Sequence, residues 1–233
     1  MSEPKKVAVI AGANRGLGSA LCVQLVERGF LVAALGREAA VQSVATEVSG
    51  VMAVGCELTA PSEVDRAFSD VEAALGPASV VVYNAHRVEL RPSAETSLGL
   101  FEELWRVNCY GAFVVAKRAI PAMLAEGQGT CIFSGATGSV RGGQRSAAFA
   151  SSKFALRGLA QSLARELSPL GIHVAHVVLD GLIWSERTRA RFDPQEQACM
   201  SPRSLAAAYS MLIEQDRSAW THELDLRPFR ERF

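Results

Sequence analysis

Three glycines near the start of the chain form a loop that could hold a phosphate group. Gly12, Gly16 and Gly18 follow an apolar run at 6–12 and precede a helical pattern at 18–29. Without Cβ atoms the backbone can turn tightly and approach a diphosphate, and the N–H groups of the next helix point at its negative charge. The strand before the loop and the helix after it are the context that a dinucleotide-binding loop requires.

The order and spacing of five motifs along the chain resemble the short-chain dehydrogenase/reductase family. The motifs are GANRGLG (12–18), YNAH (83–86), VN (107–108), FASSK (149–153) and DG (180–181). The resemblance implies an oxidoreductase with a nicotinamide dinucleotide in its cleft. It also implies catalytic roles for Lys153, which would bond the nicotinamide ribose, and for Asn108, which would order a water relay.

The same resemblance indicates that two hydroxyl groups are missing. In the family a tyrosine protonates the reduced carbonyl, a lysine four residues later lowers the tyrosine pKa, and a serine polarises the carbonyl. Here Lys153 matches the lysine, but Phe149 stands at the tyrosine position and Ala136 at the serine position. A positioned general acid contributes about 10²–10⁴ in rate, and a polarising donor about 10²–10³ more. We therefore expect proton delivery to be altered or lost.

Neighbouring polar groups could replace the missing hydroxyls. Shifting the alignment by one residue brings Thr137 to the position of the serine. The other groups are Ser134, Ser139, Tyr110, His86 and Asp180, and also Ser151 and Ser152, which we expect to point away from the Phe149 face. The alternative to a catalytic role is, for each of these groups, that it caps a turn or is solvated at the surface.

Two arginines favour NADP(H) over NAD(H). The strand-like run at 30–36 ends in glycine, where an NAD-preferring site usually has a carboxylate, and Arg37 follows it. Together with Arg15 in the glycine loop it could bind a 2′-phosphate through paired, charge-assisted bonds. The alternative is that both are solvated surface charges. The expected cofactor contacts are Gly12, Asn14, Arg15, Gly16, Leu17, Gly18, Arg37, Glu57, Leu58, Asn84, Ala85, Lys153, Gly181, Ile183 and Ser185.

The elements that position these residues alternate between strand-like and helical patterns. Apolar runs predict seven strands at 6–12, 30–36, 51–58, 79–85, 129–135, 172–181 and 222–228. Helical patterns lie at 18–29, 38–48, 60–76, 98–127, 145–171 and 202–216. We predict one α/β domain over 1–233, with a doubly wound parallel seven-stranded sheet of Rossmann type and helices on both faces. Ligands of such sheets lie beyond the carboxyl ends of the strands, and 184–201 is the expected substrate loop.

Composition excludes several other classes of protein. The chain has 24 Lys+Arg and 24 Asp+Glu, so no net field attracts nucleic acid or an anionic membrane. No apolar run is long enough for a signal peptide or a membrane span. Five scattered cysteines without a C-x-x-C pair indicate neither disulfides nor a metal site. We expect reduced thiols and a cytoplasmic location.

Two hypotheses for the function remain open at this point. The first is an NADP-dependent oxidoreductase of the short-chain type with altered proton delivery. The second is an NADP-binding protein with little or no catalysis, acting as a sensor or partner subunit. The helices at 98–127 and 145–171 resemble those through which family members pair, so either protein would form a homodimer or homotetramer. The alternative for these helices is ordinary packing against the sheet.

Overall fold

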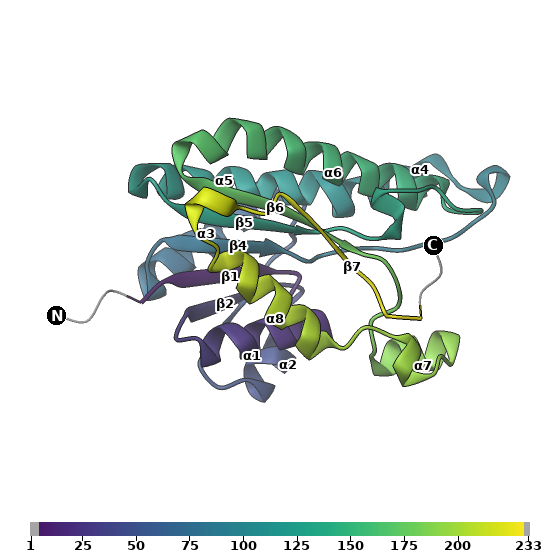
Figure 1. Ribbon diagram of the computed structural model, residues 1–233, viewed down its shortest axis with the longest axis horizontal. Coiled ribbons are helices and arrows are strands. Elements are labelled where there is room, and N and C mark those ends of the chain that lie inside the picture. The colour runs from purple at the N-terminus through teal and green to yellow at the C-terminus, as the bar shows by residue number, and fades with distance from the viewer. Residues whose placement is uncertain (1–4, 231–233) are drawn as a thin grey trace.

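The protein is built on a parallel sheet of seven strands. A computed structural model describes residues 5–230, and Figure 1 shows the sheet between two layers of helices. The strand order is β3-β2-β1-β4-β5-β6-β7, and every neighbouring pair is parallel. The strands are β1 Val7–Ala11, β2 Leu31–Gly36, β3 Val51–Gly55, β4 Ala78–Tyr83, β5 Gly129–Ser134, β6 Ile172–Leu179 and β7 Glu223–Leu226. The predicted fold class is confirmed.

Eight α-helices are found in the described part of the chain, and six of them cover the two faces of the sheet. They are α1 Leu17–Glu27, α2 Glu38–Glu47, α3 Pro61–Leu75, α4 Leu98–Trp105, α5 Gly111–Glu126, α6 Ala147–Leu167, α7 Glu186–Phe192 and α8 Pro202–Ile213. Apolar side chains of α3, α5 and α6 form one core against the sheet. Those of α1, α2 and α8 form the other core on the opposite face, as the layers in Figure 1 show.

Burial on both faces explains why the strands have continuous apolar runs instead of alternating ones. Along β1, Val7 and Val9 belong to one core, and Ala8 and Ile10 belong to the other. Successive side chains of a strand point to opposite faces, so each residue of a central parallel strand must be apolar. The helices bury only one side and therefore keep a polar outer face.

The strand order reverses between β1 and β4, and this reversal decides where a ligand can bind. From β1 the chain goes to β2 and β3 on one side and then returns to β4 on the other side of β1. The loops that follow β1 and β4 consequently separate at the carboxyl edge of the sheet. Ligands of open α/β sheets bind in the crevice at such a point.

The structure refines two of the predicted elements. The helix expected over 98–127 is continuous but contains a π-helical turn at Arg106–Tyr110 between α4 and α5. The expected substrate loop at 184–201 contains α7, which the sequence pattern did not indicate because its seven residues are mostly charged. Both differences lie at the carboxyl edge of the sheet or next to it.

Candidate cofactor and catalytic site

The glycine loop is fixed by contact with the end of β4. Gly12 has φ +86°, and a Cβ atom there would lie 2.3 Å from the Ala85 nitrogen. The Asn84 side chain donates to the Gly12 carbonyl at 3.3 Å. Any larger residue at position 12 would therefore push apart the two loops of the crevice. The structure brings together three of the residues that the sequence predicted to bind the cofactor.

The N-terminus of α1 has no side-chain cap. Gly16, at the N-cap, has φ 91°, and no side chain caps the helix. A Cβ atom on Gly18 would lie 2.9 Å from the Ala13 Cα, so the first turn packs closely on the loop. Asn14 contributes its carbonyl, which accepts from the Ser19 N–H at 2.8 Å. Uncapped N–H groups and the helix dipole together favour a phosphate at this end.

The predicted adenosine-binding residues lie at the carboxyl ends of β2 and β3. Arg37 and Glu57 line one hollow of about 350 Å³ together with Glu38 and Glu63. The Glu57 carboxylate, however, accepts from the backbone N–H and hydroxyl of Thr59 at 3.0 and 2.8 Å, so it already closes its own turn. The next residue of the motif, Leu58, is buried and belongs to a core.

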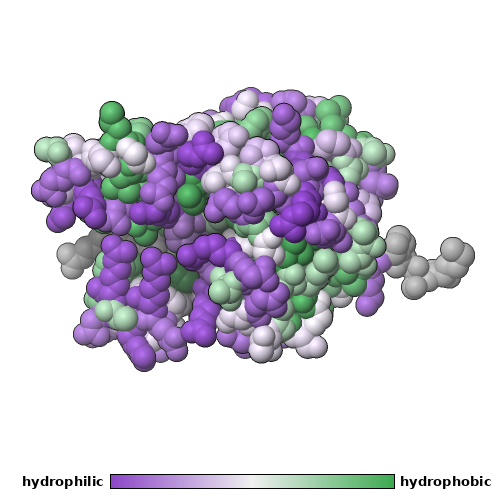
Figure 2. Space-filling view, turned by 180° about the vertical axis from the view of Figure 1, so that it is seen from behind, coloured by the Kyte–Doolittle hydropathy of each residue, from purple (hydrophilic) through white to green (hydrophobic). Residues whose placement is uncertain are grey.

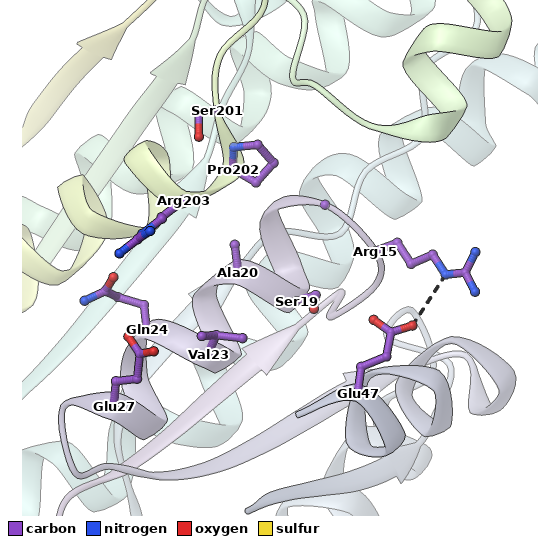
Figure 3. A pocket seen from close by; sticks show the side chains of 11 residues that line it. Arg15, Ser19, Ala20, Val23, Gln24, Glu27, Glu47, Ser201, Pro202 and Arg203 are labelled. Atoms are coloured by element: carbon purple, nitrogen blue, oxygen red, sulfur yellow. Dashed lines mark ion pairs between the residues drawn. The ribbon is translucent and has the colours of Figure 1, made fainter. Parts of the chain in front are cut away.

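Arg15 lies apart from this hollow. Its guanidinium makes long ion pairs with Glu47 at 3.8 Å and Glu186 at 3.6 Å. Figure 3 shows its side chain extended towards Glu47 at one end of a shallow groove of about 610 Å³ between α1 and α8. The groove meets the glycine loop at Gly16, and neither Arg37 nor Lys153 is among its lining residues. The sequence did not indicate this groove.

Lys153 is buried at the carboxyl end of β5. Its ammonium donates to the Ser134 carbonyl at 2.9 Å, and only 2% of the residue is exposed. Burial lowers the pKa of this lysine to about 7, because desolvation disfavours the charged form. A lysine with this pKa changes protonation state near neutral pH.

Phe149 and Ala136 lie on two elements that meet beside this lysine. The Phe149 ring packs over the turn at Thr137–Ser139, where a Cβ atom on Gly138 would lie 3.0 Å from the ring. Ala136 leads into that turn with extended backbone, and its N–H donates to the Ser139 hydroxyl at 3.1 Å. Neither side chain has a polar atom to offer a ligand.

Asn108 connects three segments of the site. In the π-helical turn its side-chain oxygen accepts from the Arg87 N–H at 2.9 Å, and its amide donates to the Arg87 carbonyl and to Ser152, both at 2.9 Å. Ser152 in turn donates to the Phe149 carbonyl at 2.7 Å. These bonds hold the loop after β4 against α6. The role of Asn108 in a proton relay remains a prediction.

Several of the groups considered as substitutes for the missing hydroxyls have partners elsewhere. Ser134 shares a 2.8 Å hydrogen bond with the hydroxyl of Tyr209. The ring of Tyr110 packs beside Trp105 with centroids 5.9 Å apart. Thr137 donates to Asp180 at 2.6 Å. Thr137 and Asp180 are thus hydrogen-bonded to each other, and Thr137 lies in the turn that follows Ala136.

His86 is an exposed residue of the loop after β4. Its Nδ1 lies 3.3 Å from the Asn84 carbonyl. Crowding by protein atoms lowers the pKa of His86 to about 4, and the positive charges of Lys153 and Arg187 lower it further. The imidazole is consequently neutral at pH 7.

The segment after β6 holds the last three predicted contacts. Gly181 has φ 147°. Ile183 forms a parallel bridge with Met200, which closes the segment into a loop. The Ser185 hydroxyl accepts from the Thr188 N–H at 3.1 Å and so caps α7. The loop is therefore held at both ends.

Two of the five cysteines lie near the site, Cys56 in the hollow beside Arg37 and Cys109 near Lys153. All five are free, and Cys199 alone is partly exposed. Burial raises the pKa of the Cys131 thiol to about 12, which makes it a poor nucleophile. Over residues 5–230 no group of three His, Cys, Asp or Glu side chains could hold a metal ion. No helix in the same range is long and apolar enough to cross a membrane.

Comparison with known proteins gives consistent matches over most of the chain. The family model described as short chain dehydrogenase matches residues 6–195. The 3-oxoacyl-[acyl-carrier-protein] reductase MabA of Mycobacterium tuberculosis is 32% identical over 219 residues, which span 90% of this chain and 86% of that protein. The short-chain dehydrogenase/reductase eriH of Hericium erinaceus is 32% identical, over 91% of this chain and 92% of that protein.

Solved structures agree with these matches. A short-chain dehydrogenase from Rhodopseudomonas palustris has a TM-score of 0.83 and 33% identity, and the match covers 96% of this chain and 99% of that one. An actinorhodin polyketide ketoreductase, solved with NADPH, has a TM-score of 0.89 at 22% identity, with 97% of each chain covered. At 22% identity, the match to the ketoreductase shows a similar fold only.

The buried ammonium of Lys153 predicts a specific dependence of stability on pH. Its pKa falls from 10.5 to about 7 on folding, so between these values the unfolded chain binds more protons and the free energy of unfolding rises with pH. Relative to Lys153→Met, we expect the wild type to gain about 1.4 kcal/mol per pH unit. Urea denaturation of the cofactor-free protein at pH 7.5 and 8.5 measures this difference. Lys117→Met, at an exposed position on α5, should keep the wild-type slope, and equal slopes for all three proteins would contradict the prediction.

Proposed function

The chain belongs to the short-chain dehydrogenase family, and from this membership we propose that it is an NADP(H)-dependent oxidoreductase acting on a carbonyl or alcohol. We further propose that Lys153 donates the proton that a tyrosine hydroxyl supplies in other members. The observation that carries the proposal is the buried Lys153 ammonium beside a phenyl ring that has no hydroxyl.

The residues of the crevice suit a nicotinamide dinucleotide. The glycine loop offers uncapped N–H groups for the diphosphate. Arg37 lies in the hollow at the ends of β2 and β3, where a 2′-phosphate would meet its guanidinium. One of the structural neighbours was solved with NADPH and another with 5-hydroxy-NADP. When bound, the reduced cofactor supplies the hydride.

Lys153 has the properties of a general acid at neutral pH. The Ser134 carbonyl occupies one of its three N–H groups, which leaves two for a ribose hydroxyl and a substrate oxygen. During reduction, one N–H bond would break as an O–H bond forms on the alkoxide. The lysine would remain as a neutral amine, which its burial favours, and would recover a proton from water. A pKa of about 7 is close to the optimum for such a transfer.

A protein that binds NADP(H) without turnover is the second candidate. The absence of a hydroxyl from both Phe149 and Ala136 favours it, since either loss alone costs orders of magnitude in rate. The glycine loop and Arg37 would serve such a protein equally well. Turnover, not binding, separates the two candidates.

Turnover and its pH dependence test the role of Lys153. We expect the wild type to oxidise NADPH with some member of a panel of aldehydes and ketones, with kcat falling about tenfold per pH unit above pH 7 as the ammonium deprotonates. Lys153→Met should lower kcat at least 10²-fold, while Lys117→Met should keep the wild-type rate. A wild type that binds NADPH but reduces nothing, with activity appearing only after Phe149→Tyr plus Ala136→Ser, would establish the second candidate.

Cofactor preference depends on Arg37. Replacing it with alanine removes the charge that would pair with the 2′-phosphate, while Glu38 and Glu57 remain in the hollow. We expect Arg37→Ala to weaken NADPH binding about 10- to 100-fold and to leave NADH binding unchanged, as measured by cofactor fluorescence. Arg165→Ala removes a guanidinium that bonds its own helix on α6 and should change neither. Equal losses for both cofactors would contradict an NADP(H) preference.

We also propose that the protein forms a homo-oligomer through α4, α5 and α6. Exposed aromatic side chains lie on these helices, with 42% of Phe101, 41% of Trp105, 42% of Phe113 and 43% of Phe154 open to water. Figure 1 shows the three helices together in one layer. We expect light scattering to give a dimer or tetramer that Phe113→Glu dissociates. Met211→Glu, 48% exposed on α8 in the other layer, should have no effect, and a monomeric wild type would contradict the proposal.

The free thiols fit a reducing compartment. None of the five cysteines is paired, and disulfides rarely persist in the cytoplasm. We therefore propose a cytoplasmic location.

A further inference from the structure

We infer that Tyr83 is a positioning residue, whose hydroxyl group holds the π-helical turn in the shape that places Asn108 against α6. Tyr83 is the last residue of β4 and lies directly before Asn84. Its phenol donates a 2.6 Å hydrogen bond to the carbonyl of Val107, which lies in the π-helical turn Arg106–Tyr110. The consequence for catalysis rests on the proposed function, whereas the consequence for the Asn108 side chain does not.

The π-helical turn leaves the Val107 carbonyl without the donor that an α-helix would give it. In an α-helix each N–H donates to the carbonyl four residues before it, so the N–H of Gly111 would donate to Val107. Here it donates to Arg106, five residues before it. The Tyr83 hydroxyl donates to the Val107 carbonyl in its place. A carbonyl that faces the protein interior is costly to leave without a donor, so this hydroxyl favours the π-helical shape over a regular α-helix.

Gly111 allows the phenol to come this close to the helix backbone. A Cβ atom on this residue would lie 2.5 Å from the Tyr83 hydroxyl oxygen and 3.2 Å from the carbonyl of Leu58. Glycine is a poor helix former compared with alanine, yet Gly111 begins α5 immediately after the turn. The phenol thus occupies a space that glycine leaves open.

The carbonyl that Tyr83 binds belongs to the peptide group that joins Val107 to Asn108. Because a peptide group is planar, the direction of this carbonyl fixes the direction in which the chain enters Asn108. The Asn108 side chain makes three hydrogen bonds, two with the backbone of Arg87 and one with the hydroxyl of Ser152, all at 2.9 Å. The phenol therefore holds the side chain where all three hydrogen bonds can form together.

Ser152 connects the turn to the residues around Lys153. Its hydroxyl accepts from the Asn108 amide and donates to the Phe149 carbonyl at 2.7 Å. Lys153 is the next residue of α6. A turn that relaxed towards a regular α-helix would shift Asn108 relative to α6 and weaken its hydrogen bond to Ser152. The proton relay expected at Asn108 would then lose its alignment with Lys153.

These residues lie inside the protein, where little water can replace a lost hydrogen bond. Hydrophilic side chains cover much of the face seen in Figure 2, but Tyr83 is 1% exposed, and Asn108 and Ser152 are 0% exposed. Burial raises the pKa of Tyr83, so its hydroxyl keeps the proton that it donates. Removing the hydroxyl alone should leave the Val107 carbonyl without this donor.

The first test follows the side-chain amide protons of Asn108 by NMR in the cofactor-free protein. Tyr83→Phe keeps the ring and removes only the hydroxyl. We expect the melting temperature to fall by about 2–4 °C, and we expect hydrogen exchange of the Asn108 side-chain amide to become about tenfold faster.

Tyr209→Phe is the matched control for this test. Tyr209 is also buried, and its hydroxyl shares a 2.8 Å hydrogen bond with Ser134. The control should lower the melting temperature to a similar extent but leave exchange of the Asn108 amide as in the wild type. Equal exchange rates in Tyr83→Phe and Tyr209→Phe would mean that the phenol only adds stability, and would overturn the inference.

A second variant disturbs the same contact from the side of the helix. Gly111→Ala should lower the melting temperature of the wild type, because the new methyl group meets the phenol oxygen. The same change should cost less in the Tyr83→Phe protein, where that oxygen is gone. Losses of the same size in both proteins would show that the phenol does not enter the turn, which also overturns the inference.

Kinetics separate this inference from the proposed function. With the aldehyde or ketone that the wild type reduces fastest, Tyr83→Phe should lower kcat about 10- to 100-fold and leave KM for NADPH unchanged. In the Asn108→Ala protein it should lower kcat no further, because both changes act on the same group. Losses that multiply independently would contradict an action through Asn108. If the wild type reduces nothing while the exchange rates behave as expected, the inference stands and the proposed function fails alone. If the wild type reduces a carbonyl while Tyr83→Phe exchanges like its control, the inference fails and the proposed function stands.

Discussion

The close passage of two backbone segments at the carboxyl edge of the sheet controls the geometry of the whole site. The loop after β1 and the loop after β4 touch where a Cβ atom on Gly12 would lie 2.3 Å from the Ala85 nitrogen. This contact is possible because β1 and β4 are parallel neighbours that end together, with Ala11 paired to Tyr83, and because Gly12 adopts positive φ. The contact between the two loops directs the N-terminus of α1 towards the crevice and places Asn84 and His86 along the wall of the crevice. The remaining site residues are arranged relative to this fixed point.

Desolvation controls the electrostatics around Lys153. Lys153 is buried against a carbonyl and not against a carboxylate, so its charge is costly and its pKa is depressed. His86 remains neutral beside it. The buried carboxylate of this region, Asp180, is shared by two arginines and a threonine. In the proposed reduction, such a site would stabilise the negative charge that develops on the substrate oxygen.

Packing explains how the fold accommodates the unusual residues. The phenyl ring of Phe149 packs over the turn that contains Gly138. The amide of Asn108 bonds both backbone groups of Arg87 and the hydroxyl of Ser152. These contacts keep α6, the π-helical turn and the loop after β4 together. The position of Lys153 therefore does not depend on a polar group at residue 149.

The sequence by itself determined the sheet, the glycine loop and the neighbourhood of Lys153 with Phe149 and Ala136. These features depend on local signals, namely continuous apolar runs, glycines between a strand and a helix, and residues one helical turn apart. The tertiary structure alone decided the partners of Asp180 and the hydrogen bonds of the Glu57 carboxylate to Thr59. Those depend on which loops the strand order brings to one edge, and pairs such as Thr137 and Asp180 are 43 residues apart. Periodicity reports the face on which a residue lies, but not which distant side chain it meets there.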